Sequence, residues 1–78
     1  MKAKIIKELK DFKGKACLIE LNKKFYVVSS ISNAFDTGMP ETLIFRSDKN
    51  GKVTDYSEVA GGRNKTRKQA ITQLEEQL

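Results

Sequence analysis

Four cationic residues lie close together near the end of the chain, where the sequence predicts that a helix begins. The free N–H groups of a helix N-terminus attract anions, and neighbouring cations strengthen that attraction. The alternative is a solvated surface, because salt screens the unfavourable interaction of cations with the helix dipole. The candidate binding site, named here the basic cluster, consists of Arg63, Lys65, Arg67 and Lys68.

The middle of the chain contains a short match to a catalytic motif, Asp36-Thr37-Gly38, which is the triplet of retroviral-type aspartic proteases. Gly62-Arg63-Asn64 is similar to the segment that precedes the C-terminal helix of those enzymes. Their chemistry needs two aspartates that share one proton across a dimer axis. Only 23 residues separate Gly38 from Gly62, too few for the flap hairpin and strands between the two motifs. We therefore expect Asp36 to cap its own turn and to have no catalytic role.

No other arrangement of side chains in the sequence favours catalysis or metal binding. The chain has no histidine. Asp48, Asn50 and Asp55 have the composition of a calcium loop, but Gly51 comes too early and no bidentate glutamate stands at its end. We therefore expect no enzymatic activity, no metal and no cofactor.

Composition and charge limit the class of protein. The 78 residues suffice for one small domain, residues 1–78, with a net charge of +5 and an acidic stretch between two basic ends. Basicity favours an anionic partner such as nucleic acid. The lone Cys17 lies in an apolar run, which predicts a buried thiol in a reducing compartment. No stretch approaches the ~18 apolar residues of a membrane span, so we expect a cytoplasmic protein with no membrane partner.

Runs rich in β-branched and aromatic residues predict a β-meander. Such runs are Phe25–Ile31, Glu41–Ser47 and Val53–Tyr56, and the apolar run Ala16–Leu21 is a fourth predicted strand. Residues 2–12 fit the spacing of a helix as well as that of a strand, with a slight preference for a strand.

Turn-forming residues separate these runs. Asn22-Lys23-Lys24 is a short polar break within a hairpin, and Asn50-Gly51 predicts a type I′ hairpin turn. Ser57 is expected to cap a single helical turn that Gly61-Gly62 ends.

The end of the chain predicts an amphipathic helix. Thr66 and Gln69 have the spacing of a capping box, in which each side chain bonds the other residue's backbone N–H. One apolar stripe follows, formed by Ala70, Ile71, Leu74 and Leu78. The predicted fold is therefore α+β, an antiparallel β-meander of about four strands with the C-terminal helix packed on one face.

Several of these residues also form a pattern that resembles a set of small phage and prophage proteins of Gram-positive bacteria. The pattern comprises Glu41-Thr42-Leu43-Ile44-Phe45, then Asp48, Gly51, Val53-Thr54-Asp55-Tyr56 and Glu58. Ile6-Lys7-Glu8-Leu9 and Tyr26-Val27-Val28-Ser29-Ser30 are also similar, so the resemblance covers most of the chain. It implies an origin in a mobile element and assigns no site residues.

A second resemblance covers only the end of the chain. Lys65-Thr66-Arg67-Lys68-Gln69-Ala70, followed by Leu74, is similar to the helix that closes the arm-site DNA-binding domain of tyrosine integrases. Two functions are therefore expected. The first is a non-enzymatic accessory protein, monomeric or weakly homodimeric, that binds a host or phage protein and modulates host machinery or defence. The alternative is a small DNA- or RNA-binding module that uses the basic cluster.

Overall fold

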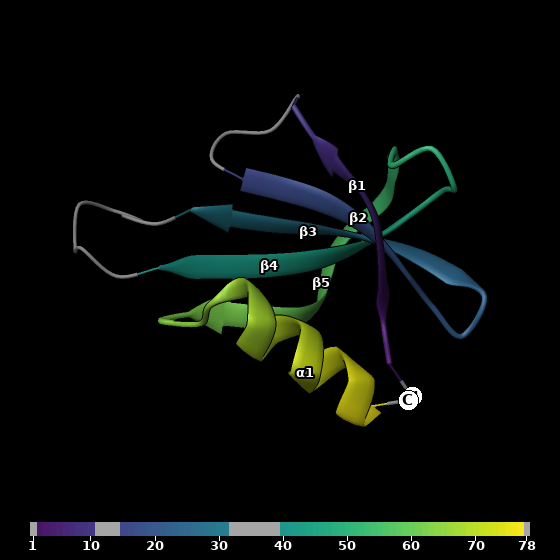
Figure 1. The fold of residues 1–78 in the computed structure, drawn as a ribbon. Helices are drawn as coiled ribbons and strands as arrows, with labels where there is room; N and C mark the ends of the chain where they lie inside the picture. The colour runs from purple at the N-terminus through teal and green to yellow at the C-terminus, as the bar shows by residue number, and fades with distance from the viewer. Residues whose placement is uncertain (1, 11–14, 32–39, 78) are drawn as a thin grey trace.

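The computed structural model describes residues 2–10, 15–31 and 40–77. The elements are, in chain order, β1 (Lys4–Leu9), β2 (Lys15–Leu21), β3 (Lys24–Ile31), β4 (Glu41–Ser47), β5 (Val53–Arg63) and α1 (Arg67–Gln77). Each strand pairs antiparallel with the next, in the order β1-β2-β3-β4-β5, and α1 covers one face of the sheet (Figure 1). The predicted α+β meander with a C-terminal helix is confirmed, with five strands where about four were expected.

The ambiguous N-terminal segment forms a strand. β1 lies at one edge of the sheet and pairs only with β2. Its register shifts between Ile5 and Lys7, so Ile6 is an extra residue that forms a bulge. Because the strand has only one neighbour, Ile5 is 53% exposed and Ile6 41% exposed. Two consecutive isoleucines at a bulge explain why the apolar spacing also fitted a helix.

The core lies between α1 and the sheet, and central strands contribute most of it. β2 is buried on both faces, as a strand with apolar residues on both sides should be. On the helix side, the buried residues are Cys17, Ile19, Leu21, Tyr26, Val28, Ile44, Ala60, Ala70 and Leu74. Cys17 is a free, buried cysteine, as predicted, and burial raises the pKa of its thiol.

The two described hairpin turns differ in type. Asn22 and Lys23 both have positive φ, at 54° and 64°, which is the type I′ geometry that matches the twist of paired strands. The type I′ prediction for Asn50-Gly51 is wrong, because only Gly51 has a positive φ, at 89°. Asp48 N donates to Lys52 O, which leaves a three-residue loop that ends in a left-handed glycine.

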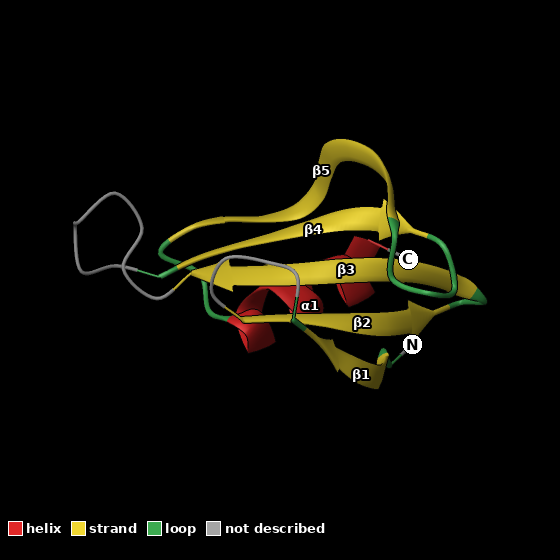
Figure 2. Ribbon diagram, turned by 90° about the horizontal axis from the view of Figure 1, so that it is seen from above, coloured by secondary structure: helices red, strands yellow, loops and turns green. Residues whose placement is uncertain are grey.

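The predicted helical turn after Ser57 is also wrong, because this segment belongs to β5. β5 pairs with β4 near both of its ends, through Arg46–Asp55 and Ile44–Ala60, so residues 56–59 all face the single residue Phe45. Figure 2 shows this part of β5, named here the β5 arch, rising away from β4. Pairing with β4 at both ends of the segment therefore outweighs the local preference for a turn.

The C-terminal helix begins with the predicted capping box. Thr66 N donates to Gln69 Oε1 at 2.9 Å, and Gln69 N donates to Thr66 Oγ1 at 3.2 Å. Ala70 and Leu74 are buried, and Ile71 packs against the core while half-buried. Leu78, the last residue of the predicted stripe, lies outside the described residues.

Candidate functional site

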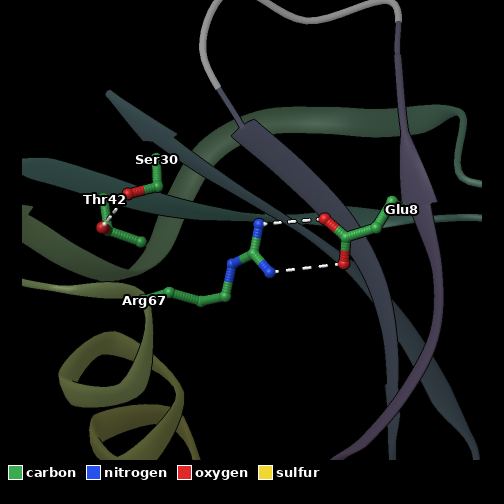
Figure 3. A network of polar contacts seen from close by, with 4 residues as sticks. All are labelled: Glu8, Ser30, Thr42 and Arg67. Carbon is green, nitrogen blue, oxygen red and sulfur yellow. Dashed lines mark hydrogen bonds and ion pairs between the residues drawn. The ribbon is translucent and has the colours of Figure 1, made fainter. Parts of the chain in front are cut away.

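The turn that carries the basic cluster is held by polar contacts from β4 and from the residue that precedes it. Thr42 is fully buried, and its hydroxyl donates to the backbone oxygen of Lys65 at 2.8 Å. Because a hydroxyl has one proton, the 3.0 Å contact with Ser30 Oγ requires Ser30 to donate (Figure 3). Asn64 N donates to Pro40 O at 2.7 Å. The backbone of this turn is therefore anchored to the sheet at two points.

The four members of the basic cluster have different surroundings in the structure. The Arg67 guanidinium donates two hydrogen bonds of 3.3 Å to the Glu8 carboxylate on β1 (Figure 3). Lys65 Nζ donates to Gln73 Oε1 at 2.9 Å. Arg63 is exposed at the end of β5, and Lys68 is exposed on the first turn of α1. Arg67 is therefore paired with a carboxylate, whereas Lys65 and Lys68 line one hollow of about 370 Å³ on α1.

Charges that oppose the helix dipole fasten α1 to the N-terminal segment. Arg67 at the positive end of α1 pairs with Glu8. Glu75 near the negative end accepts a 2.6 Å hydrogen bond from Ala3 N through Oε2. Both contacts join the helix to residues that precede or belong to β1. This tertiary role accounts for Arg67 and Glu75, two of the charges whose placement is unfavourable for the isolated helix.

A hollow of about 280 Å³ lies beside these two contacts, between the N-terminal segment and the helix. Two of its lining residues are apolar, Ile5 from β1 and Ile71 from α1. The remaining lining residues carry three positive charges and one negative charge. This hollow, named here the β1–α1 groove, is lined by Lys2, Ile5, Arg67, Lys68, Ile71, Thr72 and Glu75.

A second hollow, of about 310 Å³, lies beside the β2–β3 turn. Its cations are Lys23, Lys24 and Arg46, and Phe25, Tyr26, Ser47 and Thr54 complete its lining. One of these cations, Arg46, has Asp55 as a neighbour at 3.9 Å, with both side chains exposed. The sequence analysis treated the two lysines as a polar break and did not anticipate this basic surface.

The carboxylates of Asp48 and Asp55 accept hydrogen bonds from nearby backbone N–H groups. Asp48 accepts hydrogen bonds from Lys52 N and Asn50 N, which hold the pKa of its carboxyl below the ordinary value. Asp55 accepts from Ser57 N, which lowers the pKa of that carboxyl as well. Within residues 2–10, 15–31 and 40–77, no three His, Cys, Asp or Glu side chains are grouped so that they could hold a metal ion. Asp36 lies outside the described residues.

Of the predicted site residues, Arg67 and Lys68 line the β1–α1 groove, whereas Arg63 and Lys65 do not. Lys2 and Ile5, from the N-terminal segment, also line this groove, although the sequence did not predict them as site residues. The sequence feature that could have indicated these residues is a pair of isoleucines among lysines, in a strand for which no second neighbouring strand was predicted.

Comparisons with known proteins give no family assignment. No family model, no curated protein and no solved structure matches the chain. Among the described residues, no helix has the length and apolar character needed to cross a membrane.

Proposed function

We propose that this chain is a non-enzymatic accessory protein of a phage or prophage that acts in the bacterial cytoplasm. Its role is to bind a host or phage protein through the β1 edge and the adjoining groove. The observation that supports this proposal is the exposure of Ile5 and Ile6 on an edge strand. Among the described residues, the only other exposed large apolar side chain is Tyr56, on the opposite edge strand.

The way in which β1 is exposed favours binding through side chains. Lysines and a bulge are devices by which proteins prevent an edge strand from pairing with another strand. β1 and its flanks contain both, with the bulge at Ile6 and exposed Lys4, Lys7 and Lys10. The partner is therefore expected to cover isoleucine and lysine side chains, and not to add a sixth strand.

The nucleic-acid alternative is supported by a different observation, the row of exposed lysines along β1 together with Lys68. Phosphate contacts of this kind make the affinity fall with salt, by a slope of about −0.9 per contact on duplex DNA. The pairing of Arg67 with Glu8 neutralises one cation of the site that the alternative invoked, whereas Lys65 keeps its charge beside the neutral amide of Gln73. We therefore rank protein binding first.

Affinity capture with matched variants tests the proposal. Tagged wild-type protein, an Ile5→Ser/Ile6→Ser variant and a Tyr56→Ser variant are incubated with lysate of a Gram-positive bacterium, with and without phage infection and with and without nuclease treatment. We expect a protein that wild type and Tyr56→Ser retain equally and that the β1 variant loses. Retention by all three alike, or retention that disappears after nuclease treatment, would contradict protein binding through β1.

A further inference from the structure

On the basis of the proposed protein-binding function, we propose that the β1–α1 groove binds an acidic segment of the partner. One apolar side chain of that segment inserts between Ile5 and Ile71, and carboxylates on either side of it pair with Lys2 and Lys68. The partner's chemistry is thus a single aliphatic or aromatic anchor within a run of glutamates or aspartates.

The groove is large enough to admit an apolar side chain. Its volume of about 280 Å³ lies just below the roughly 300–1,000 Å³ of small-molecule sites. The Arg67–Glu8 and Glu75–Ala3 contacts hold the helix beside β1, so the groove does not depend on the partner to form. Ile5 is 53% exposed, and burying it removes apolar surface from water.

The positive charge of the groove favours a negatively charged partner segment. Arg67 is paired with Glu8, and one oxygen of Glu75 is taken by Ala3 N–H. Lys2 and Lys68 are exposed and have no hydrogen-bond or ion-pair partner within the part of the chain that the structure describes. Two unpartnered cations beside an apolar lining are complementary to carboxylates that flank an apolar residue.

A second copy of the chain offers similar chemistry and is the main competitor. The β5 arch carries Tyr56, which is 73% exposed, near Asp55 and Glu58. Two contacts already engage this segment within its own chain. The Tyr56 ring packs on Phe45 with centroids 5.6 Å apart, and the Asp55 carboxylate accepts from Ser57 N. We therefore assign the groove to a foreign acidic segment.

Isoleucine-methyl NMR of the full chain tests this assignment directly. The probe is a synthetic twelve-residue peptide with one central leucine and glutamates on both sides. The methyl signals of Ile5 and Ile71 should move on titration, whereas those of the fully buried Ile19 and Ile44 should stay. Replacing the leucine with serine, or the glutamates with lysine, should abolish the movement.

Charge-reversal variants separate the groove from general electrostatics. Lys2→Glu with Lys68→Glu should weaken peptide binding by about tenfold or more. The matched control, Lys24→Glu with Lys49→Glu, changes the net charge equally at exposed lysines that do not line the groove, and should leave affinity within about twofold.

Three results would overturn the assignment. These are stationary Ile5 and Ile71 signals up to millimolar peptide, equal binding of the lysine peptide, and movement of both signals with protein concentration alone, which would place a second copy in the groove. Lysate capture that still depends on Ile5 and Ile6 would then leave the proposed function standing. Conversely, if the peptide binds but capture from lysate does not depend on β1, only the proposed function is contradicted.

Discussion

The two edge strands of the sheet solve the problem of a free edge in different ways. β1 is short, carries exposed isoleucines and lysines, and is joined to α1 by polar contacts at Glu8 and Ala3. β5 is longer, arches away from β4 and returns to it at Ala60 and Gly61. The arch disrupts the edge of β5 through backbone geometry, whereas β1 is disrupted only by one bulge and its charges.

This difference between the two edge strands predicts that the return of β5 matters for stability and that β1 matters for binding. The return of β5 depends on a backbone approach that tolerates no side chain, because a Cβ at Gly61 would lie 2.0 Å from Thr42 O. The exposed apolar side chains of β1 contribute little to the core. We therefore expect substitutions where β5 returns to β4 to change the stability of the fold, and substitutions on β1 to change binding.

The largest effect is expected at Gly61. Gly61→Ala should destabilise the protein by about 4 kcal/mol or more, because the backbone of β4 or β5 must move to remove the clash. Gly62→Ala is the matched control: its φ of 142° is strained for alanine, but no atom lies within 4 Å of the added Cβ. It should cost about 1–3 kcal/mol in denaturant unfolding. Equal losses at both positions would show that the β4–β5 approach is not the constraint.

The next largest effect is expected at Leu74, which joins α1 to the sheet. Leu74→Ala should cost about 2–5 kcal/mol, because the side chain is almost fully buried in the core. That is a large fraction of the stability of so small a domain. An unchanged unfolding midpoint would mean that the polar contacts with β1, and not apolar packing, hold the helix.

Two neighbouring cations on α1 should behave oppositely. Arg67→Gln removes the pair with Glu8, which is 60% exposed, and should cost about 0.2–1 kcal/mol. Lys68→Gln removes an exposed cation from the positive end of the helix and should stabilise by a few tenths of a kcal/mol. Thermal unfolding of both variants at low salt measures the difference. A gain in stability at both positions would show that the Arg67–Glu8 pair does not hold the helix to β1.

The smallest effect concerns the turn that leads into β5. Backbone donors, chiefly Lys52 N–H, lower the pKa of Asp48, so the ionised carboxylate stabilises the folded state. This contribution is present above the ordinary aspartate pKa near 4 and is lost as pH falls through the lower folded-state value. Asp48→Asn should therefore destabilise at pH 7 and approach wild type under acid. If the difference in stability between Asp48→Asn and wild type stayed constant across this pH range, the ionised carboxylate would not be what stabilises the fold.

The central strands and the helix could be predicted because their signals are local. An apolar run specified β2, runs with β-branched and aromatic residues specified β3 and β4, and the Thr66–Gln69 pair specified the start of α1. The β5 arch could not be predicted, because pairing with β4 overrides the local turn preference after Ser57.

The groove could be predicted only in part. Arg67 and Lys68 were identified from their position at a helix N-terminus. Lys2 and Ile5 were not, because they lie beside the helix only through the folding together of the two ends of the chain, as at the Ala3–Glu75 contact, which no local pattern encodes.

Hydrogen exchange of the protein with and without its captured partner tests the central claim most directly. If β1 and the groove form the binding face, the partner should slow amide exchange in residues 2–10 and 67–72 and leave residues 53–60 unchanged. Slower exchange confined to the β5 arch, with β1 unaffected, would contradict the assignment of binding to the β1 edge.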